Sequence, residues 1–292
     1  CDLIEFNDVN FAYPSRPDRM ALTGLNLNIK TGERVALVGP SGAGKSTLFD
    51  LLLRFRDPQF GDIKIDGQKL KDMNLQTLRD LFALVPQQPV LFSANVWDNL
   101  RYGAPDATQE QVYSAAKAAH AHDFIMQLPD GYQSFLGEQG VKLSGGQKQR
   151  VCIARALAAK PKLIICDEVT SALEQLVAEG ILELLARLQE ERDLTYMFIA
   201  HDLATVRSIA DDVVVMKDGR IVEQGPKHEM FQPPQHPYTE LLLSSVPEMD
   251  PDWLTNLLRE RGVDNIGDAA VDKMNDESYR MTGQRNHKGD KP

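Results

Sequence analysis

The stretch "GPSGAGKST", residues 39–47, constrains the fold of this 292-residue chain more than any other feature. It follows the apolar run "RVALV" and leads into the helix-forming run "STLFDLLLRF". A glycine-rich turn between a strand and a helix lets consecutive backbone N–H groups point at an anion, and the start of the helix adds partial positive charge. The stretch therefore predicts a phosphate-binding loop for a nucleoside triphosphate.

The side chains of this loop have separate expected tasks. Lys45 reaches the terminal phosphates, and Ser46 ligates Mg²⁺. The residues of the loop that are expected to bind nucleotide are Gly39, Ser41, Gly42, Gly44, Lys45, Ser46 and Thr47. The alternative, a glycine-rich turn beside a solvated lysine, is much weaker because both flanking elements are those that the loop requires.

Two acids end another apolar run, "KLIICDE", residues 162–168. Ligands of open parallel sheets bind beyond the carboxyl ends of strands, so Asp167 is expected to act on Mg²⁺ through a bound water. Glu168 reaches further toward the γ-phosphate and is expected to polarise the attacking water. Taken alone, acids in this position are about as often helix caps or solvated turn residues. Together with the upstream loop, they favour catalysis.

Three further residues carry weaker signals. His201 follows the strand pattern "TYMFIA" and is a candidate donor to the γ-phosphate, although such histidines are more often structural caps. Gln87 follows "FALVP" and is a candidate Mg²⁺ ligand, although a single glutamine carries little information. Tyr13 is a candidate surface for stacking the adenine ring, and an ordinary packing role is an equal alternative.

The stretch "LSGGQ", residues 143–147, predicts a second anion site at the start of a helix, without a lysine. Its expected nucleotide-contacting residues are Ser144, Gly145, Gly146 and Gln147. The stretch lies in a helical segment and cannot easily fold back onto the first loop. We therefore expect a head-to-tail dimer, in which this element of one domain covers the ATP bound by the other.

The remaining sequence indicates an α/β organisation. Short strand patterns separated by turns dominate residues 3–91, and residues 94–160 become helical, with Thr108 and Gln111 in a capping-box arrangement. After Pro161, apolar strands alternate with helices, which is typical of a parallel sheet covered by helices. The run "DVVVMKDGRIVEQG" predicts a hairpin that turns at Asp218 and Gly219.

Composition excludes several classes of protein. The net charge of −10 argues against a nucleic-acid-binding surface, which normally carries an excess of basic residues. The three cysteines lack metal-ligand spacing and are expected to be reduced thiols. Because no apolar run approaches about 18 residues, no membrane-spanning helix is expected. The start at Cys1 without a signal-peptide pattern suggests a piece of a longer protein.

These motifs, in this order, resemble the nucleotide-binding domain of ABC (ATP-binding cassette) transporters from about residue 3 to residue 245. The resemblance implies an α/β fold: a P-loop NTPase core with a mixed sheet, an antiparallel β subdomain and an inserted helical subdomain at about 94–160. It implies an ATPase domain at 1–246. We expect residues 247–292 to form a polar tail that is partly helical or disordered.

The resemblance also assigns roles. Tyr13 contacts adenine, Lys45 the β- and γ-phosphates, and His201 the γ-phosphate. Mg²⁺ is assigned to Ser46, Gln87 and Asp167, water activation to Glu168, and the partner's γ-phosphate to Ser144 and Gly146. The implied partners are a second nucleotide-binding domain, in a homo- or heterodimer with ATP, and a transmembrane domain, which places the chain at the cytoplasmic face of a membrane. No nucleic-acid partner is expected.

Two departures from the family pattern stand out. The chain has "SALE" where "SALD" is usual, so Glu174 replaces an aspartate that organises the dimer interface. In addition, "NFAYPSRPDRMAL" and "VPQQPVLFSANVWDNLRYG" resemble exporters, whereas "HPYTELLLSSVP" resembles peptide importers. The chain therefore looks like a hybrid of two subfamilies.

The sequence leaves three other functions open. One is a non-transport ATPase of the same superfamily, acting in DNA repair or on ribosomes. The acidic balance disfavours it, and so does the lack of a coiled-coil insertion or a second cassette. Another is a lone phosphate-loop kinase, in which "LSGGQ" would have no purpose. The last is a cassette that binds ATP but has lost turnover through Glu174 or the hybrid junction.

Overall fold

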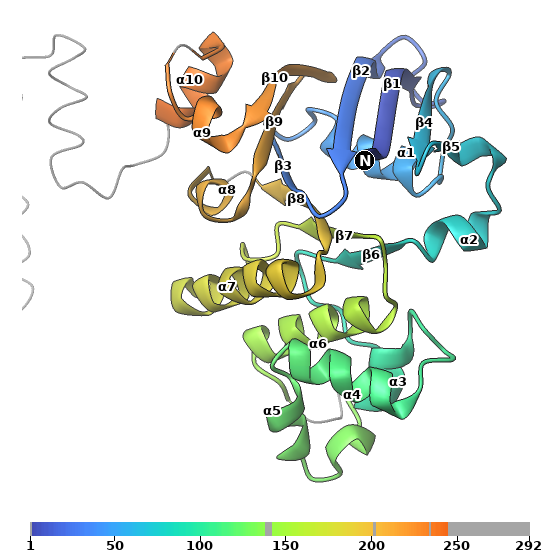
Figure 1. Cartoon of the computed structure of the whole chain (residues 1–292), viewed down its shortest axis with the longest axis vertical. Coiled ribbons are helices and arrows are strands. Elements are labelled where there is room, and N and C mark those ends of the chain that lie inside the picture. The colour runs from blue at the N-terminus through green and yellow to red at the C-terminus, as the bar shows by residue number, and fades with distance from the viewer. Residues whose placement is uncertain (1, 138–141, 201–202, 234, 245–292) are drawn as a thin grey trace, which may run out of the picture. The chain divides into compact units, whose positions relative to one another are not determined.

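The structure, a computed structural model, describes residues 2–137, 142–200, 203–233 and 235–244 (Figure 1). The chain divides into two compact units, residues 1–243 and residues 244–292. The helices and strands described below belong to the first unit, except that the last helix ends at Ser244, the last described residue. The tail predicted at 247–292 lies outside the described residues.

Ten strands in the described part of the chain form two sheets. The six-stranded sheet has the order β10-β9-β3-β8-β7-β6, and all of its neighbouring strands are parallel except the antiparallel pair β9 and β10. Its strands are β3 (Arg34–Val38), β6 (Phe82–Val85), β7 (Leu163–Asp167), β8 (Thr195–Ala200), β9 (Asp212–Lys217) and β10 (Arg220–Pro226). The expected parallel sheet and the hairpin at its edge are both confirmed.

The second sheet is antiparallel and has the order β2-β1-β4-β5. Its strands are β1 (Asp2–Ala12), β2 (Met20–Lys30), β4 (Phe60–Ile65) and β5 (Gln68–Lys69). Along β2, buried Leu25, Leu27 and Ile29 alternate with exposed Asn26 and Asn28, as expected for a sheet with one face in solvent. The expected antiparallel β subdomain is therefore present.

The two sheets share one hydrophobic core. Helix α1 (Lys45–Leu52) follows β3 through the glycine-rich loop and buries Leu48 and Leu51. These side chains belong to the same cluster as Phe6 of β1 and Ile165 of β7. All six residues of β8 are buried, as expected for a central strand whose two faces are both covered. This shared core holds the glycine-rich loop between the two sheets.

A run of helices lies between β6 and β7 in the chain. Its members are α3 (Val96–Arg101), α4 (Gln109–Ala118), α5 (His122–Met126) and α6 (Gly145–Ala158). Helix α4 begins with the predicted capping box of Thr108 and Gln111. The helix-forming run after it is broken at His120, whose φ of 51° lies in the left-handed region. Figure 1 shows these helices on the side of the six-stranded sheet away from β1 and β2.

The remaining helices border the six-stranded sheet. They are α2 (Leu75–Arg79), α7 (Gln175–Arg192), α8 (Leu203–Ile209), α9 (Lys227–Met230) and α10 (Pro237–Ser244). The hairpin of β9 and β10 turns at Asp218 and Gly219, with φ values of 50° and 76°. Left-handed backbone at both central residues is the geometry that matches the twist of paired strands. Among the described residues, no helix is both long and apolar enough to cross a membrane.

Candidate nucleotide-binding site

The glycine-rich loop occupies residues 39–44, between β3 and α1. Gly39 has a φ of 153° and Gly44 a φ of 106°, both unfavourable for residues with a side chain. A Cβ at Gly39 would collide with the backbone carbonyl of Met216, and one at Gly44 would lie 2.7 Å from Leu22 Cδ2. These two glycines are required because β2 and β9 pack directly against the loop.

The Lys45 side chain lies along the inside of the loop. Its Nζ donates hydrogen bonds to the carbonyl oxygens of Gly39, at 2.6 Å, and Pro40, at 3.0 Å. Burial lowers the pKa of Lys45, and the charges of Glu168 and Asp167 act in the opposite direction. The loop therefore holds a cation close to two carboxylates, an arrangement suited to balancing a polyanion.

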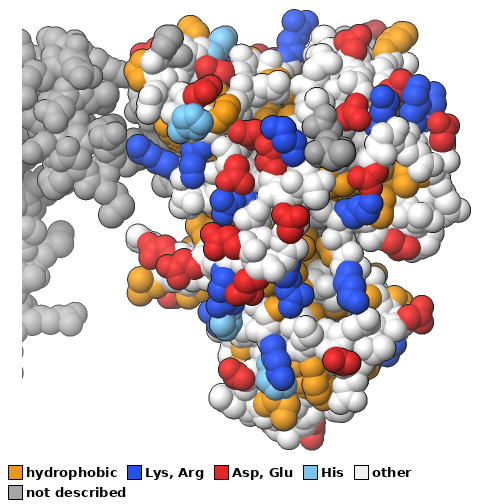
Figure 2. All heavy atoms as spheres, in the orientation of Figure 1, with side chains coloured by type: hydrophobic (Ala, Val, Ile, Leu, Met, Phe, Trp, Pro, Cys, Tyr) orange, Lys and Arg blue, Asp and Glu red, His pale blue; other side chains and the backbone are white. Residues whose placement is uncertain are grey.

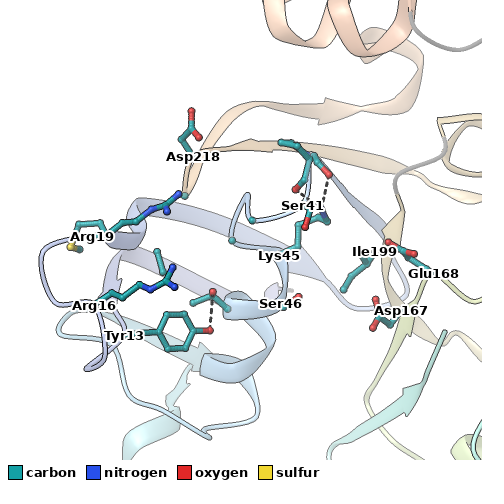
Figure 3. Close-up of a pocket in the computed structure, with 18 residues that line it drawn as sticks. Tyr13, Arg16, Arg19, Ser41, Lys45, Ser46, Asp167, Glu168, Ile199 and Asp218 are labelled. Atoms are coloured by element: carbon teal, nitrogen blue, oxygen red, sulfur yellow. Dashed lines mark hydrogen bonds between the residues drawn. The ribbon is translucent and has the colours of Figure 1, made fainter. Parts of the chain in front are cut away.

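A cavity of about 870 Å³ opens beside the loop (Figure 3). The predicted site residues that line it are Tyr13, Gly39, Ser41, Gly42, Gly44, Lys45, Ser46, Thr47, Asp167 and Glu168. In Figure 3, Tyr13 lies at one end, Asp167 and Glu168 lie at the other, and Lys45 and Ser46 lie between them. The cavity therefore brings together an aromatic ring, a cationic loop and a pair of acids from β1, α1 and β7.

Sequence reasoning missed part of this lining. Arg16 and Arg19 lie in the turn between β1 and β2, and Asp218 and Gly219 come from the β9–β10 hairpin. The turn follows Tyr13 directly, with Arg16 N–H donating to the Tyr13 carbonyl oxygen at 2.8 Å. The two arginines in "YPSRPDR" were a visible signal, because guanidinium groups favour phosphate. No pattern in the sequence linked the hairpin to the cavity.

Tyr13 is both packed and accessible. Its hydroxyl donates to Asp50 Oδ2 at 2.9 Å and lies 3.1 Å from Thr47 Oγ1. Phe11 contacts the ring edge-on, and the Arg56 guanidinium lies over the ring at 5.5 Å from its centroid. Burial raises the pKa of Tyr13, so the hydroxyl stays protonated at neutral pH. These contacts fix the ring at the wall of the cavity. A ring in this position is compatible with adenine stacking and also with an ordinary packing role.

Asp167 and Glu168 stand at the carboxyl end of β7. Burial raises the pKa of Asp167, as does the neighbouring Glu168, while Lys45 lowers it. Glu168 has a φ of 44°, a left-handed conformation that is rare for a residue with a side chain. Its backbone N–H donates to the carbonyl oxygen of Ile199 in β8 at 3.1 Å, which holds the turn in place. Such strained backbone is typical of functional sites.

Gln87 lies just after β6 and is not among the residues that line the cavity. Its Nε2 donates to Glu168 Oε2 at 2.9 Å and to Ser171 Oγ at 3.0 Å. The Ser171 hydroxyl in turn donates to the Glu168 carbonyl oxygen at 3.0 Å. Gln87 therefore reaches the site through Glu168, and its amide N–H, not its oxygen, faces the acid.

The "LSGGQ" stretch begins α6, and Ser144 is its N-cap. Ser144 Oγ accepts from Gln147 N–H at 3.2 Å, and Gln147 Oε1 accepts from Ser144 N–H at 2.9 Å. None of residues 144–147 lines the cavity. Gly146 has a packing reason as well, because a Cβ there would lie 2.6 Å from Val177 Cγ1 of α7. Sequence reasoning assigned Gly146 to anion binding alone and missed this contact.

Glu174 is the N-cap of α7. Its side chain makes no capping hydrogen bond. Aspartate is among the best N-cap residues because its short side chain reaches the N–H groups of the first turn. His201, the remaining predicted site residue, lies outside the described residues.

Comparison with known proteins shows which family this chain belongs to. The family model described as "ABC transporter" matches residues 22–171. The chain belongs to the ABC transporter family. Its fold and glycine-rich loop are those of the family's nucleotide-binding domain, as the sequence predicted. Nucleotide-binding domains of this family are ATPases.

Similar proteins are found among curated ABC transporters. The chain is 45% identical, over 82% of its length, to "ABC transporter B family member 13" of Arabidopsis thaliana. It is 48% identical, again over 82% of its length, to "ABC transporter B family member 2" of Dictyostelium discoideum. The aligned part covers 19% and 17% of those proteins, so this ABC domain spans about a fifth of the length of the relatives it matches.

A solved structure, "Structure of a bacterial Atm1-family ABC exporter with ATP bound", superposes with a TM-score of 0.74 at 40% identity. The match covers 84% of this chain and 42% of that one. A second family model, "Oligopeptide/dipeptide transporter, C-terminal region", matches residues 222–267. The predicted likeness of the C-terminal part to peptide transporters is thereby confirmed, beside B-family and exporter matches over most of the chain.

Proposed function

We propose that this chain is the ATP-binding and ATP-hydrolysing domain of an ABC transporter, which dimerises head-to-tail around two ATP molecules to power solute movement across a membrane. The observation that carries the proposal is the 870 Å³ cavity, because one space is lined by Tyr13, the glycine-rich loop and the acid pair. An adenine ring at Tyr13 and phosphates along the loop would bring the γ-phosphate toward Asp167 and Glu168 (Figure 3).

Side chains around the cavity would bind the nucleotide at several points. The Tyr13 ring offers a stacking surface at one end, beside Arg16 and Arg19. Lys45 would exchange its hydrogen bonds to the Gly39 and Pro40 carbonyl oxygens for bonds to the phosphates, which carry more negative charge. Ser41 and Gly42 of the loop and Thr47 of α1 also line the cavity.

Mg²⁺ fits the residues at the inner end of the cavity. Ser46 and Asp167 line it with a hydroxyl and a carboxylate, and hard oxygen ligands are those that Mg²⁺ prefers. The third proposed ligand, Gln87, fits less directly, because its amide nitrogen faces Glu168. When bound, the ion would neutralise charge on the β- and γ-phosphate oxygens.

Glu168 is the proposed general base. Its carboxylate lies at the inner end of the cavity, and the hydrogen bond from Gln87 holds it there. From this position it would accept a proton from the water that attacks the γ-phosphorus. We assign His201 as a donor to the γ-phosphate. Because Gln87 is hydrogen-bonded to Glu168, a movement of the segment after β6 would also shift this general base.

A second domain would complete the site. Ser144, Gly145, Gly146 and Gln147 lie away from this chain's own cavity, at the start of α6, where free N–H groups and the helix dipole favour an anion. We propose that they contact the γ-phosphate of ATP held by another copy of this domain or by a similar one. The head-to-tail dimer follows because each domain would bring its "LSGGQ" stretch to the nucleotide cavity of the other.

The transmembrane partner is proposed to dock beside Gln87 and residues 88–103, which places the domain at the cytoplasmic face of the membrane. Leu84, Val90 and Tyr102 are large apolar side chains with 52%, 57% and 64% exposure in this region. Exposed large apolar side chains in one region of the chain are consistent with a binding surface. The acidic net charge is consistent with the absence of a nucleic-acid partner.

Phosphate release by the isolated 292-residue chain tests the proposal. Wild-type protein should release phosphate from ATP with Mg²⁺, and Lys45→Ala should reduce the rate by at least about 100-fold, because the loop loses its charge on the phosphates. Arg220→Gln, a change on exposed β10, is the control and should keep the wild-type rate. ATP binding without turnover in the wild type would instead favour the alternative of a catalytically impaired cassette. The observation that supports this alternative is that the Glu174 side chain makes no capping hydrogen bond at the start of α7.

A further inference from the structure

A second cavity, of about 620 Å³, lies where α7 meets the inserted helices. Its lining comes from α5 and the residues on either side of it, from α6 and from the middle of α7, and shares no residue with the nucleotide cavity. Figure 2 shows basic, acidic and histidine side chains side by side along this junction. The cavity is thus separate from the site proposed above.

Gly180 in α7 forms part of the cavity lining. A Cβ placed there meets no atom within 4 Å, and its φ is not in the left-handed region. Neither a close neighbour nor the backbone conformation therefore requires glycine. Glycine is nevertheless the least favourable residue in a helix interior apart from proline. Its presence keeps the cavity open, because any side chain here would extend into it.

Two arginines, Arg150 of α6 and Arg187 of α7, line the same cavity. The Nε of each is buried and has no hydrogen-bond partner among the described residues. Arg187 Nε lies 3.5 Å from Glu191 Oε1, an ion pair without a hydrogen bond. A buried N–H without an acceptor is costly, and the guanidinium group matches the geometry of carboxylate and phosphate. Arg187 is partly satisfied, because its Nη2 donates to the Ala118 carbonyl oxygen at 3.5 Å and Glu191 lies beside it, whereas the Nε of Arg150 has no acceptor in the described structure.

Acidic residues at the same cavity do not satisfy the arginines. Asp123 and Glu183 also line it, but both are exposed to solvent, and neither forms an ion pair with the two arginines in the described structure. Solvent screens exposed charges more strongly than half-buried ones. Burial lowers the pKa of the adjacent His120, the charges of Arg187 and Arg150 lower it further, and those of Asp123 and Glu191 raise it. Two arginines and two carboxylates thus line the cavity, and the buried Nε donors without an acceptor distinguish the arginines.

We propose that this cavity binds a small anion bearing a carboxylate or phosphate group, held by Arg150 and Arg187 beside the bare backbone of Gly180. Such a ligand would join α6, which begins with the "LSGGQ" stretch, to α7, which begins at Glu174. Both helix starts belong to the proposed dimer interface. The bound anion would therefore regulate the assembly without contacting the nucleotide.

Calorimetric titration of the full chain tests this inference. The Lys45→Ala variant is the background, because it removes the phosphate affinity of the nucleotide loop and makes the result independent of the proposed ATPase activity. Inorganic phosphate and succinate are titrated separately, so that the two anion chemistries are distinguished. We expect saturable one-site binding of at least one of them.

Variants in the same background locate the binding site. Arg150→Gln and Arg187→Gln should each weaken binding by about tenfold or more, because each removes a charge-assisted hydrogen bond. Gly180→Gln should block the cavity and abolish binding while the melting temperature of the unliganded chain stays equal or rises, since glutamine is a good helix former. Arg220→Gln removes an equal charge on exposed β10 and should leave the affinity unchanged. The absence of saturable binding for both anions, or binding that Gly180→Gln leaves intact, would overturn the proposal.

Discussion

At the scale of single residues, the site depends on side chains whose environment the fold has changed. Lys45 is half-buried against loop carbonyl oxygens, and Glu168 has left-handed backbone at the end of a buried strand. Neither arrangement is favourable for the isolated residue, and both place charge where a nucleotide would meet it. Two other residues, Glu174 and Glu33, have environments that give simple stability predictions.

Replacing Glu174 by aspartate should stabilise the protein by about 0.5–1 kcal/mol, because aspartate can accept from the free N–H groups at the start of α7 and glutamate does not. Urea unfolding followed by circular dichroism measures the change. Glu174→Gln is the matched control and should differ little from wild type, since it too leaves the helix uncapped. Equal unfolding midpoints for the aspartate and glutamine variants would contradict the assignment of this residue as an uncapped N-cap.

Glu33 predicts a dependence of stability on pH. Burial, followed by a hydrogen bond with Asp212, raises the pKa of Glu33 to about 7. Because the folded-state pKa exceeds the unfolded value, this group contributes its full stability below about pH 4.5 and loses it as pH rises through about 7. The side chain is only partly buried, so solvent screening limits the effect to about 1 kcal/mol.

The measurement compares wild type with Glu33→Gln in urea at pH 5 and pH 8. Wild type should lose stability relative to the variant between the two values, because glutamine does not titrate. A stability difference between the two proteins that is the same at both pH values would contradict the raised pKa of Glu33.

At the scale of elements, the contact between α6 and α7 joins the "LSGGQ" stretch to the helix that follows Glu168 in the chain. The lack of a side chain at Gly146 lets Val177 of α7 approach closely. A rigid contact of this kind would transmit a displacement of one helix to the other. The sequence pattern that looked purely functional therefore also has a packing role.

Gly146→Ala should destabilise the protein by about 1–2 kcal/mol, because the added Cβ overlaps Val177, even though alanine is the better helix former. Thermal and urea unfolding measure the loss. Combining it with Val177→Ala should recover part of the stability by removing the overlap. Gly180→Ala in α7 is the control: with nothing within 4 Å of its Cβ, it should stabilise by up to about 1 kcal/mol. A stabilising Gly146→Ala would show that the two helices are not in close contact.

At the scale of the whole molecule, the nucleotide cavity and the "LSGGQ" stretch belong to different parts of the fold. Under the proposed function, one chain would carry both halves of a composite site, and a second copy would be needed to join them. The proposed dimer solves this by symmetry, since two copies related head-to-tail make two complete sites.

Glu168→Gln should accumulate the closed dimer with ATP and Mg²⁺, because the amide keeps the shape of the side chain but cannot accept the proton from water. Size-exclusion chromatography with light scattering should show about twice the mass of the 32.6 kDa chain. Adding Ser144→Arg, which fills the proposed contact, should return the protein to a monomer. A Glu168→Gln variant that stays monomeric at saturating ATP would argue against the composite site.

The sequence alone determined the glycine-rich loop, the strand and helix order, the capping box of α4 and the turn at Asp218 and Gly219, because each depends on residues close together in the chain. Tertiary structure decided the rest. It alone placed the hairpin and Arg16 in the nucleotide cavity, tied Gln87 to Glu168, set Gly146 against Val177, and opened the cavity at Gly180. These contacts join segments distant in sequence, and their geometry follows from how sheets and helices pack around a shared core, which no local pattern encodes.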